Sequence, residues 1–271
     1  MTSWEGGECM KYFKVFLPWI LFLVIASPSL ATDEEASREK ILRNFQKVAA
    51  GAKIQEPTLD TPTRSPAGPK LYRLVVNAVV YVGTADGALA SGAVVSNSGL
   101  IITNWHVVGG KSTVGIVFKQ AIRQDKTVLK KEDVLFAKVV KIDQTRDLAL
   151  LKLVSTPPGL TIVQLGSLSD VETGQDVFAI SHPEGLPWSY TEGVISQIRP
   201  KYEWRSESGS VHRATMIQTQ TVVSFGSSGA PLFDGNGRLI GVVVSSAGPG
   251  LNFAIAIDEV RDFILSALEK R

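Results

Sequence analysis

The residues of this chain with the clearest chemical potential lie at positions 225–232, FGSSGAPL, between the apolar runs 216–223 and 239–244. Apolar runs on both sides of a glycine-containing segment are typical of a tight turn between two strands. Glycine allows the backbone to approach a ligand closely, and successive N–H groups can converge on an oxyanion. The turn therefore predicts Ser228 as a nucleophile and the N–H groups of Gly226 and Ser228 as an oxyanion hole.

A serine hydroxyl is a weak nucleophile at neutral pH, so this hypothesis needs a histidine base and a carboxylate that holds it. His106 stands where the apolar run 100–102 ends, a place from which a rigidly held side chain can reach a cleft. The alternative for a single histidine is a core residue bonded to a carbonyl group. His182, which precedes a proline, and His212, which follows the polar stretch 206–210, are expected in loops or at the surface.

Asp147 is the candidate carboxylate, because it directly precedes the apolar run 148–151. A carboxylate at that point is partly buried and needs hydrogen-bond partners, and a histidine N–H is a suitable one. The structural alternative for Asp147 is a turn cap, and Asp143, in a more polar stretch, is its rival. The chain order His106, Asp147, Ser228 places two members of a triad in one half of the chain and the serine in the other.

The length and composition of the chain limit the classes of protein to which it can belong. The chain has 271 residues, of which 44% are hydrophobic, and a formal net charge of +2. This length can bury one large core or two smaller ones, and the interspersed charges give no reason to expect a nucleic-acid partner. The single cysteine, Cys9, excludes an intrachain disulfide, and the sequence has no spacing typical of metal ligands or of a phosphate-binding loop. We therefore expect neither a metal nor a cofactor.

The first 31 residues are interpreted as a signal peptide. Lys11 and Lys14 precede the apolar run 15–26, and small residues lie three and one before a cut after Ala31. Such a segment predicts an exported protein, periplasmic or secreted.

An uncleaved membrane anchor is the alternative for this segment. About 12 apolar residues, interrupted by Pro18, are fewer than the roughly 20 that a spanning helix needs, so cleavage is favoured and the mature chain would begin near Thr32. Acidic residues at the very start are unusual for a signal peptide. Whether translation starts at Met1 or at Met10 is left open.

Residues 32–70 are expected to form a helix and a linker. Apolar residues recur at helical spacing across 33–50 with charges on the opposite face, which predicts an amphipathic helix. Packing of this helix on its own domain is favoured, and a contact that joins subunits of a homo-oligomer is the alternative. Four prolines between positions 57 and 69 indicate irregular backbone, so the folded body is expected to start near Leu71.

The remainder of the chain indicates an all-β fold. Short apolar runs rich in β-branched residues alternate with Gly, Asn and Asp turns, and the stretch 155–159 separates two series of them. We predict a first β-barrel over 71–158 and a second β-barrel with a C-terminal helix over 159–271, with Asp258 as its N-cap. The expected strands lie at 71–82, 92–96, 100–102, 114–118, 134–140, 177–180, 193–198, 214–223, 239–244 and 253–257.

Three segments together resemble the catalytic motifs of trypsin-like serine proteases of the HtrA/Deg group: 103–108 (TNWHVV), 147–152 (DLALLK) and 226–232 (GSSGAPL). The similarity also takes in 217–219 (IQT) and 252–255 (NFAI), so it spans roughly residues 91–257. The resemblance implies two perpendicular chymotrypsin-like antiparallel β-barrels and a His106-Asp147-Ser228 triad. It also implies endopeptidase cleavage of polypeptide substrates, namely unfolded or damaged exported proteins.

The chain also departs from the family pattern. Ser227 and Ala230 replace a usual Asn and Gly beside the nucleophile, and Gln220 replaces a common Asp. The chain ends at Arg271 directly after the terminal helix, so no peptide-binding PDZ module is expected. These substitutions keep open a second function, a catalytically silent module that binds peptides without cutting them.

The resemblance also suggests a specificity pocket. In trypsin-like folds the pocket base is the residue six positions before the nucleophile, here Val222, and a slip of one residue would bring Thr221 or Val223 there. None of these carries a charge, so cleavage after small or medium aliphatic residues is expected. The expected pocket walls are Ser245, Ser246 and Asn252.

Overall fold

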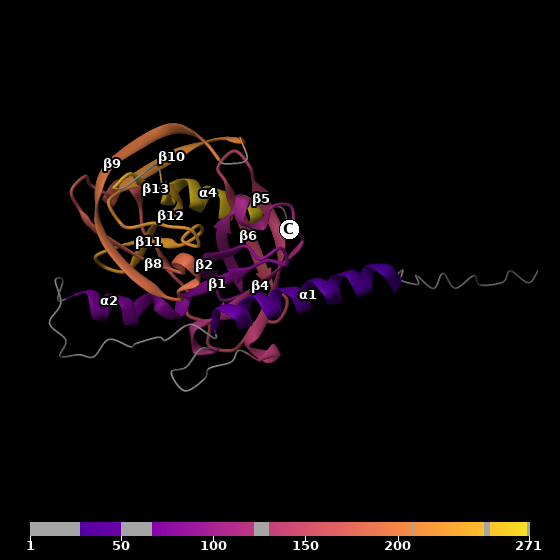
Figure 1. Cartoon of the computed structure of the whole chain (residues 1–271). Helices are drawn as coiled ribbons and strands as arrows, with labels where there is room; N and C mark the ends of the chain where they lie inside the picture. The colour runs from indigo at the N-terminus through magenta and orange to yellow at the C-terminus, as the bar shows by residue number, and fades with distance from the viewer. Residues whose placement is uncertain (1–27, 50–66, 122–129, 207–208, 247–249, 270–271) are drawn as a thin grey trace, which may run out of the picture.

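The computed structural model describes residues 28–49, 67–121, 130–206, 209–246 and 250–269 (Figure 1). Six antiparallel strands form a closed barrel in the order β1-β2-β3-β6-β5-β4. A turn around Gly99, whose φ of +83° suits glycine, joins two of them into a hairpin. The strands of this first barrel are β1 (Val79–Gly83), β2 (Leu89–Ser96), β3 (Leu100–Asn104), β4 (Thr113–Phe118), β5 (Val134–Asp143) and β6 (Leu148–Leu153).

The second sheet has the order β11-β8-β9-β10-β13-β12-β7, and an additional pairing of β11 with β12 joins its six antiparallel strands into a ring. The ring order β8-β9-β10-β13-β12-β11 repeats the order of the first barrel, shifted by seven strands. The predicted all-β fold of two barrels is thereby confirmed. The strands are β7 (Gln164–Leu165), β8 (Asp176–Ser181), β9 (Ser189–Arg205), β10 (Val211–Thr219), β11 (Pro231–Asp234), β12 (Arg238–Ser246) and β13 (Asn252–Ala256).

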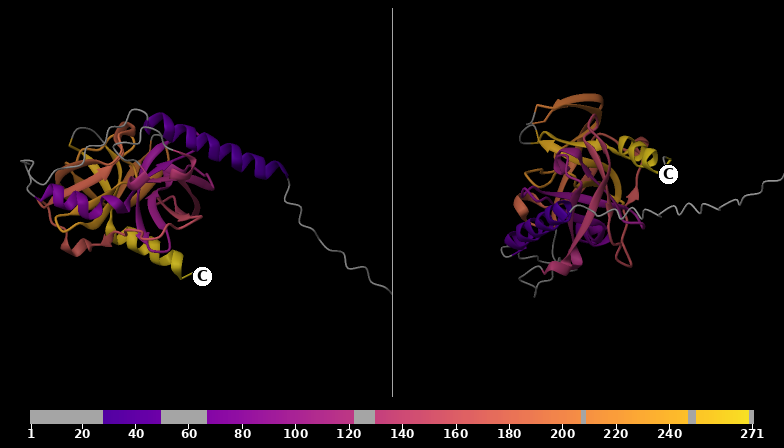
Figure 2. Two further views of the ribbon diagram at one scale, coloured as in Figure 1. Left: turned by 90° about the horizontal axis from the view of Figure 1, so that it is seen from below. Right: turned by 90° about the vertical axis from the view of Figure 1, so that its right-hand side faces the viewer.

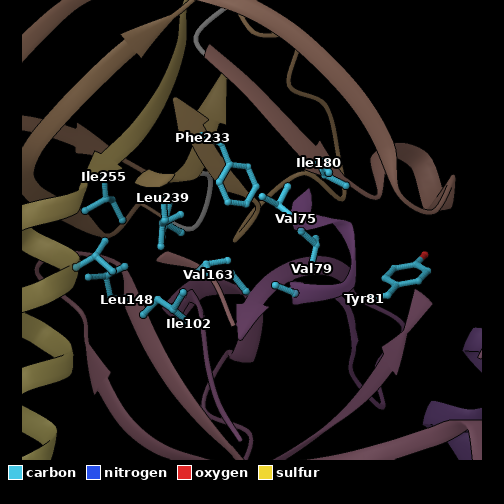
Figure 3. Packing of buried hydrophobic residues seen from close by; sticks show 14 of the residues in the cluster. Val75, Val79, Tyr81, Ile102, Leu148, Val163, Ile180, Phe233, Leu239 and Ile255 are labelled. Carbon is cyan, nitrogen blue, oxygen red and sulfur yellow. The ribbon is translucent and has the colours of Figure 1, made fainter. Parts of the chain in front are cut away.

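One apolar cluster runs across both barrels (Figure 3). Ile102 and Leu148 of the first barrel and Phe233 and Ile255 of the second belong to it, and each is 0% exposed. Because apolar burial contributes about 25 cal/mol per Å², this shared cluster fixes the barrels against each other. The interface between them can therefore carry a site built from both.

Helix α1 (Pro28–Ala49) packs on the first barrel, and α4 (Ile257–Leu268) lies on the opposite face of the molecule (Figure 2). Ile41 and Phe45 of α1 are fully buried, as the predicted amphipathic pattern requires. They fit over Gly83 and Gly115, where any larger residue would collide with them. Within the described residues, no helix is long and apolar enough to cross a membrane.

The prediction of a strand starting at Leu71 was wrong. Residues 68–75 form helix α2 (Gly68–Val75), followed by the 3-10 turn η1 (Val76–Ala78), and the strand starts only at Val79. Pro69 suits the first turn of a helix, and Tyr72 and Val75, three residues apart, face the core. Tertiary packing of this helical face outweighs the β-propensity of the valines.

Several further boundaries differ from the prediction; β9, for example, spans Ser189–Arg205 where a strand was expected at 193–198. Strand β10 ends at Thr219, not at Val223, because the Thr219 hydroxyl bonds Val194 O at 3.0 Å and accepts the Thr221 N–H at 3.1 Å. Such local side-chain bonds compete with the sheet ladder. Asp258 lies in the first turn of α4 and accepts the Leu168 N–H, and Ala256, at the N-cap, provides no side-chain cap.

Gly115→Ala tests the docking of α1. The added methyl group would lie 2.3 Å from Ile41 Cγ2 and 2.9 Å from Phe45 Cε2, so we expect α1 to shift and amide hydrogen exchange across 37–47 to accelerate. Gly235→Ala is the control, because nothing lies within 4 Å of its added Cβ. Equal exchange rates across 37–47 in the two variants would contradict this packing.

Candidate active site

His106 lies in the single helical turn α3 (Trp105–Val108), which directly follows strand β3. Two hydrogen bonds anchor the start of this turn. Asn104 Nδ2 and the Trp105 N–H both donate to the carbonyl oxygen of Asp147, at 3.0 and 3.1 Å. The His106 side chain stays 34% exposed. The end of β3 thus holds a histidine rigidly while leaving its ring accessible, as predicted.

Asp147 is 1% exposed and binds His106 through both carboxylate oxygens. Oδ1 accepts the His106 N–H at 2.9 Å, and Oδ2 accepts from Nδ1 at 2.7 Å. The second bond fixes the tautomer with the proton on Nδ1, which leaves Nε2 able to take a proton. Asp147 has a φ of +57°, which Asp tolerates better than most residues and which aims its carboxylate back at His106.

Asp143, the alternative candidate for the triad carboxylate, has a different structural role. Asp143 accepts the Arg146 N–H at 3.0 Å and lies 3.7 Å from the Arg146 guanidinium, so it holds the turn between β5 and β6. Asp147 is therefore the carboxylate that the structure places beside His106.

Ser228 lies between β10 and β11, and the backbone around it is pinned to the first barrel. The Ser91 N–H of β2 donates to Ser228 O at 2.8 Å. A side chain at Gly229 would lie 2.1 Å from Ser91 O and 2.3 Å from the Thr103 hydroxyl, so only glycine allows this approach to β2 and β3. Since β3 leads directly to His106, the serine turn and the histidine lie at the same junction of the barrels.

The Ser228 hydroxyl itself donates to Val244 O at 3.2 Å. Among the described residues, no hydrogen bond joins it to His106. A triad with this serine as nucleophile therefore requires the hydroxyl to exchange Val244 O for His106 as its partner, and catalytic hydrogen bonds often tighten only in the complex with substrate.

The backbone of the serine turn offers two free donors. The N–H groups of Gly226 and Ser228 donate to no acceptor among the described residues, as an oxyanion hole requires. Gly226 has a φ of +92°. The carbonyl of Phe225 accepts the Glu184 N–H at 2.7 Å, and because a trans peptide points its C=O and N–H in opposite directions, the Gly226 N–H faces away from Glu184.

A second buried histidine lies beneath this turn. His182 was expected in a loop or at the surface; it lies in the loop that follows β8, but it is 0% exposed. Its Nδ1 lies 2.9 Å from the Ser91 hydroxyl, which in turn donates to Gly226 O at 2.9 Å. Burial lowers the pKa of His182 to about 3, so it is neutral at physiological pH.

The surface expectation for His212 was also wrong. His212 lies in β10, is 1% exposed, bonds Gln144 O through Nδ1 at 2.7 Å and packs between Trp105 and Trp204. Strand β10 therefore supports the loop that leads to Asp147. For both histidines and for Ser91 the deciding contacts join residues at least 68 positions apart, so no local pattern could have revealed them.

The structure describes the side chains of only some of the residues expected to form the specificity pocket. Val222 is 65% exposed, whereas Thr221 is fully buried. Asn252 is 4% exposed and donates from Nδ2 to Thr221 O at 2.8 Å. Ser245 and Ser246 lie in β12, where Ser246 pairs with Asn252, and their side chains lie outside the described part. Their roles stay predictions.

Two barrels of identical strand order, with a paired histidine and aspartate on one and a serine turn on the other, define the architecture of trypsin-like peptidases. Residues 90–242 match the family model of the trypsin-like peptidase domain, and the chain belongs to this family. The relatives that the chain matches confirm the predicted resemblance to the HtrA/Deg group.

Three relatives illustrate the similarity. The chain is 32% identical over 203 residues to serine protease HTRA1A of Danio rerio, which covers 74% of this chain and 38% of the relative. It is 34% identical over 175 residues to the chloroplastic Protease Do-like 1 of Arabidopsis thaliana, 63% of this chain and 37% of the relative. It is 34% identical over 182 residues to mitochondrial serine protease HTRA2 of Drosophila pseudoobscura pseudoobscura, 67% of this chain and 39% of the relative. The chain thus spans less than two fifths of each of these proteins.

His182 predicts how stability depends on pH. Its pKa is about 3 in the fold and near 6.5 when unfolded, so between these values the unfolded chain binds a proton that the folded chain does not. Burial of neutral His182 therefore lowers the free energy of unfolding as the pH falls below 6.5, by up to about 1.4 kcal/mol per pH unit. Above pH 6.5 the effect of His182 on the free energy of unfolding is constant. Urea unfolding at pH 7.5, 6 and 5 should show a shallower loss in His182→Asn. Identical slopes in the two proteins would contradict the burial of a neutral histidine.

Proposed function

We propose that this chain is a serine endopeptidase in which His106, Asp147 and Ser228 form the catalytic triad. The observation that carries this proposal is the two-point contact of a buried Asp147 carboxylate with the backbone and ring of His106. A surface or merely structural histidine has no need of such orientation. The free N–H groups at Gly226 and Ser228 supply the second requirement of acyl transfer.

The mechanism follows the geometry of the triad. His106 Nε2 takes the proton of the Ser228 hydroxyl as its oxygen bonds to the substrate carbonyl carbon, and Asp147 stabilises the imidazolium that forms. The carbonyl oxygen becomes an oxyanion bound by the N–H groups of Gly226 and Ser228, each worth roughly 3 kcal/mol. His106 then protonates the amine as the C–N bond breaks. Water, activated in the same way, releases the acyl group and restores Ser228.

The substrate class is polypeptide, and by family resemblance we propose unfolded or damaged exported proteins. Export is supported by the signal-like pattern of Lys11 and the apolar run 15–26. Most of that segment lies outside the described residues. N-terminal sequencing of the exported protein would show a start near Thr32, whereas cytosolic protein that retains residues 10–31 would contradict export.

The second candidate is a silent peptide-binding module of the same fold. The hydrogen bond from Ser228 to Val244 O favours it, because the hydroxyl is directed at a carbonyl in the structure. The oriented His106 favours the enzyme. A fluorophosphonate probe distinguishes the two, since only an activated serine forms the covalent adduct.

Substitution of the triad tests the proposal directly. Ser228→Ala should abolish probe labelling and lower kcat for casein-type substrates by about 10⁶, and Asp147→Asn should lower kcat by about 10⁴, because the wrong His106 tautomer results. Asp143→Asn is the matched control and should retain nearly full activity, since its partner is Arg146. Residual Ser228→Ala turnover within tenfold of wild type, or greater damage from Asp143→Asn, would refute the assignment.

Specificity gives an independent prediction. The proposed pocket base at Val222 and its neighbours Thr221 and Val223 are uncharged, so a substrate ammonium group there would lose water without gaining a counter-ion. We expect cleavage after Val, Ala or Ile, with modest discrimination of about 1–3 kcal/mol per methylene. Profiling with a peptide library measures this preference. Dominant cleavage after Lys or Arg would overturn the pocket assignment.

A further inference from the structure

We propose that His182 and Ser91 are positioning residues that hold the backbone of the oxyanion hole in its productive orientation. This inference rests on the proposed peptidase function. Neither residue touches the place where substrate would react. They act on the carbonyl of Gly226, next to the N–H group that would bind the oxyanion.

Ser91 binds the serine turn on both sides of Ser227. Its hydroxyl donates to Gly226 O at 2.9 Å, and its backbone N–H donates to Ser228 O at 2.8 Å. Ser91 belongs to β2 of the first barrel, so both bonds cross to the second. The peptide groups that directly follow the two proposed oxyanion donors are thereby fixed to one fully buried residue.

The single proton of the Ser91 hydroxyl determines the state of His182. Gly226 O can only accept, so the Ser91 proton goes to it, and the two contacts from His182 to Ser91 Oγ must both be donors. These are the His182 backbone N–H at 3.2 Å and Nδ1 at 2.9 Å. His182 therefore carries its proton on Nδ1.

The surroundings of Nε2 agree with this tautomer. Nε2 is buried and has no partner among the described residues. A proton there would be an orphaned buried donor, and a second proton on the ring would be an unpaired buried charge, whereas a bare nitrogen leaves only an acceptor unmatched. The neutral Nδ1–H form is thus the one that satisfies both Ser91 and Gly226.

Aromatic rings hold the imidazole in place. Tyr81 stacks on His182 with ring centroids 4.3 Å apart and planes 7° from parallel, and Trp188 packs edge-on at 5.0 Å. Trp188 is itself anchored by a bond from Nε1 to Val79 O at 3.0 Å. This packing fixes the plane of the ring, and the bond to Ser91 fixes which edge carries Nδ1.

The backbone of His182 and of the residues that follow it also contacts the serine turn. The Glu184 N–H donates to Phe225 O at 2.7 Å, and a side chain at Gly226 would lie 2.3 Å from His182 O. If the Phe225–Gly226 peptide turned over, its carbonyl oxygen would take the place of the Gly226 N–H and repel an oxyanion. The Glu184 bond opposes that rotation directly, and the Ser91 bond to Gly226 O holds the next peptide group, Gly226–Ser227, in place.

The test compares variants that keep or remove the donor at Nδ1. His182→Leu removes it, and Ser91→Ala removes the proton given to Gly226 O. Loss of one oxyanion donor costs about 10²–10³ in kcat, so we expect losses of that order with KM nearly unchanged. His182→Asn places an amide N–H near the position of Nδ1, and we expect its kcat to stay within about tenfold of wild type.

The experiment uses the full chain, measuring kcat and KM on a cleaved peptide, the rate of fluorophosphonate labelling and the urea midpoint of each variant. Val114→Ala, a fully buried core substitution in β4, is the control for lost stability and should keep the wild-type kcat. Ser91→Ala keeps the test decisive if His182→Leu does not fold. The ¹⁵N shifts of the His182 ring, read in wild-type protein, should show a protonated Nδ1 and a bare Nε2.

The outcomes separate the two proposals. Wild-type kcat in folded His182→Leu or Ser91→Ala, or a proton on Nε2 of His182, would overturn the positioning role while leaving the peptidase intact. A wild-type chain that neither labels nor cleaves would refute the peptidase function and the positioning role with it. Loss of kcat in His182→Leu with recovery in His182→Asn, at equal stability, supports the inference.

Discussion

Everything at the site depends on the fixed contact between the two barrels. His106 and Asp147 belong to the first barrel and Ser228 to the turn of the second, so any sliding of one barrel would separate the base from the proposed nucleophile. Two kinds of interaction oppose sliding. The shared apolar cluster is closely packed, which opposes sliding without selecting a direction. The hydrogen bonds from Ser91 to the serine turn are directional, because their strength depends on distance and angle.

Buried polar groups at this interface determine how the two barrels are oriented against each other. Thr103 donates to Ser91 O at 2.8 Å, Ser91 donates to Gly226 O, and His182 donates to Ser91, so each member of the network fixes the next. A half-satisfied network would cost more than an apolar one, and among the side chains of Thr103, Ser91 and His182 the unpaired atom is Nε2 of His182. An unmatched acceptor is the least costly exception that the geometry allows.

The sequence predicted what local chemistry determines. Alternating apolar runs located most strands, and an aspartate directly before an apolar strand identified Asp147 over Asp143, because burial forces such a carboxylate to find a donor. The roles of His182, Ser91 and His212 could not be predicted, since their partners lie far away in the chain. Helix α2 was missed for a related reason: Tyr72 packs on Tyr190 and Val75 lies beside Gly237, and both of these partners are far away in the chain.

Tyr81 connects the packing of α1 to the site. Its ring meets Phe45 of α1 edge-on at 5.1 Å and stacks on His182 at 4.3 Å, so one side chain takes part in both contacts. Removing Tyr81 would disturb both contacts together and could not separate them. Gly115 touches the helix side alone and Ser91 the site side alone, so coupling between them would be measurable only as non-additivity of changes at these two residues.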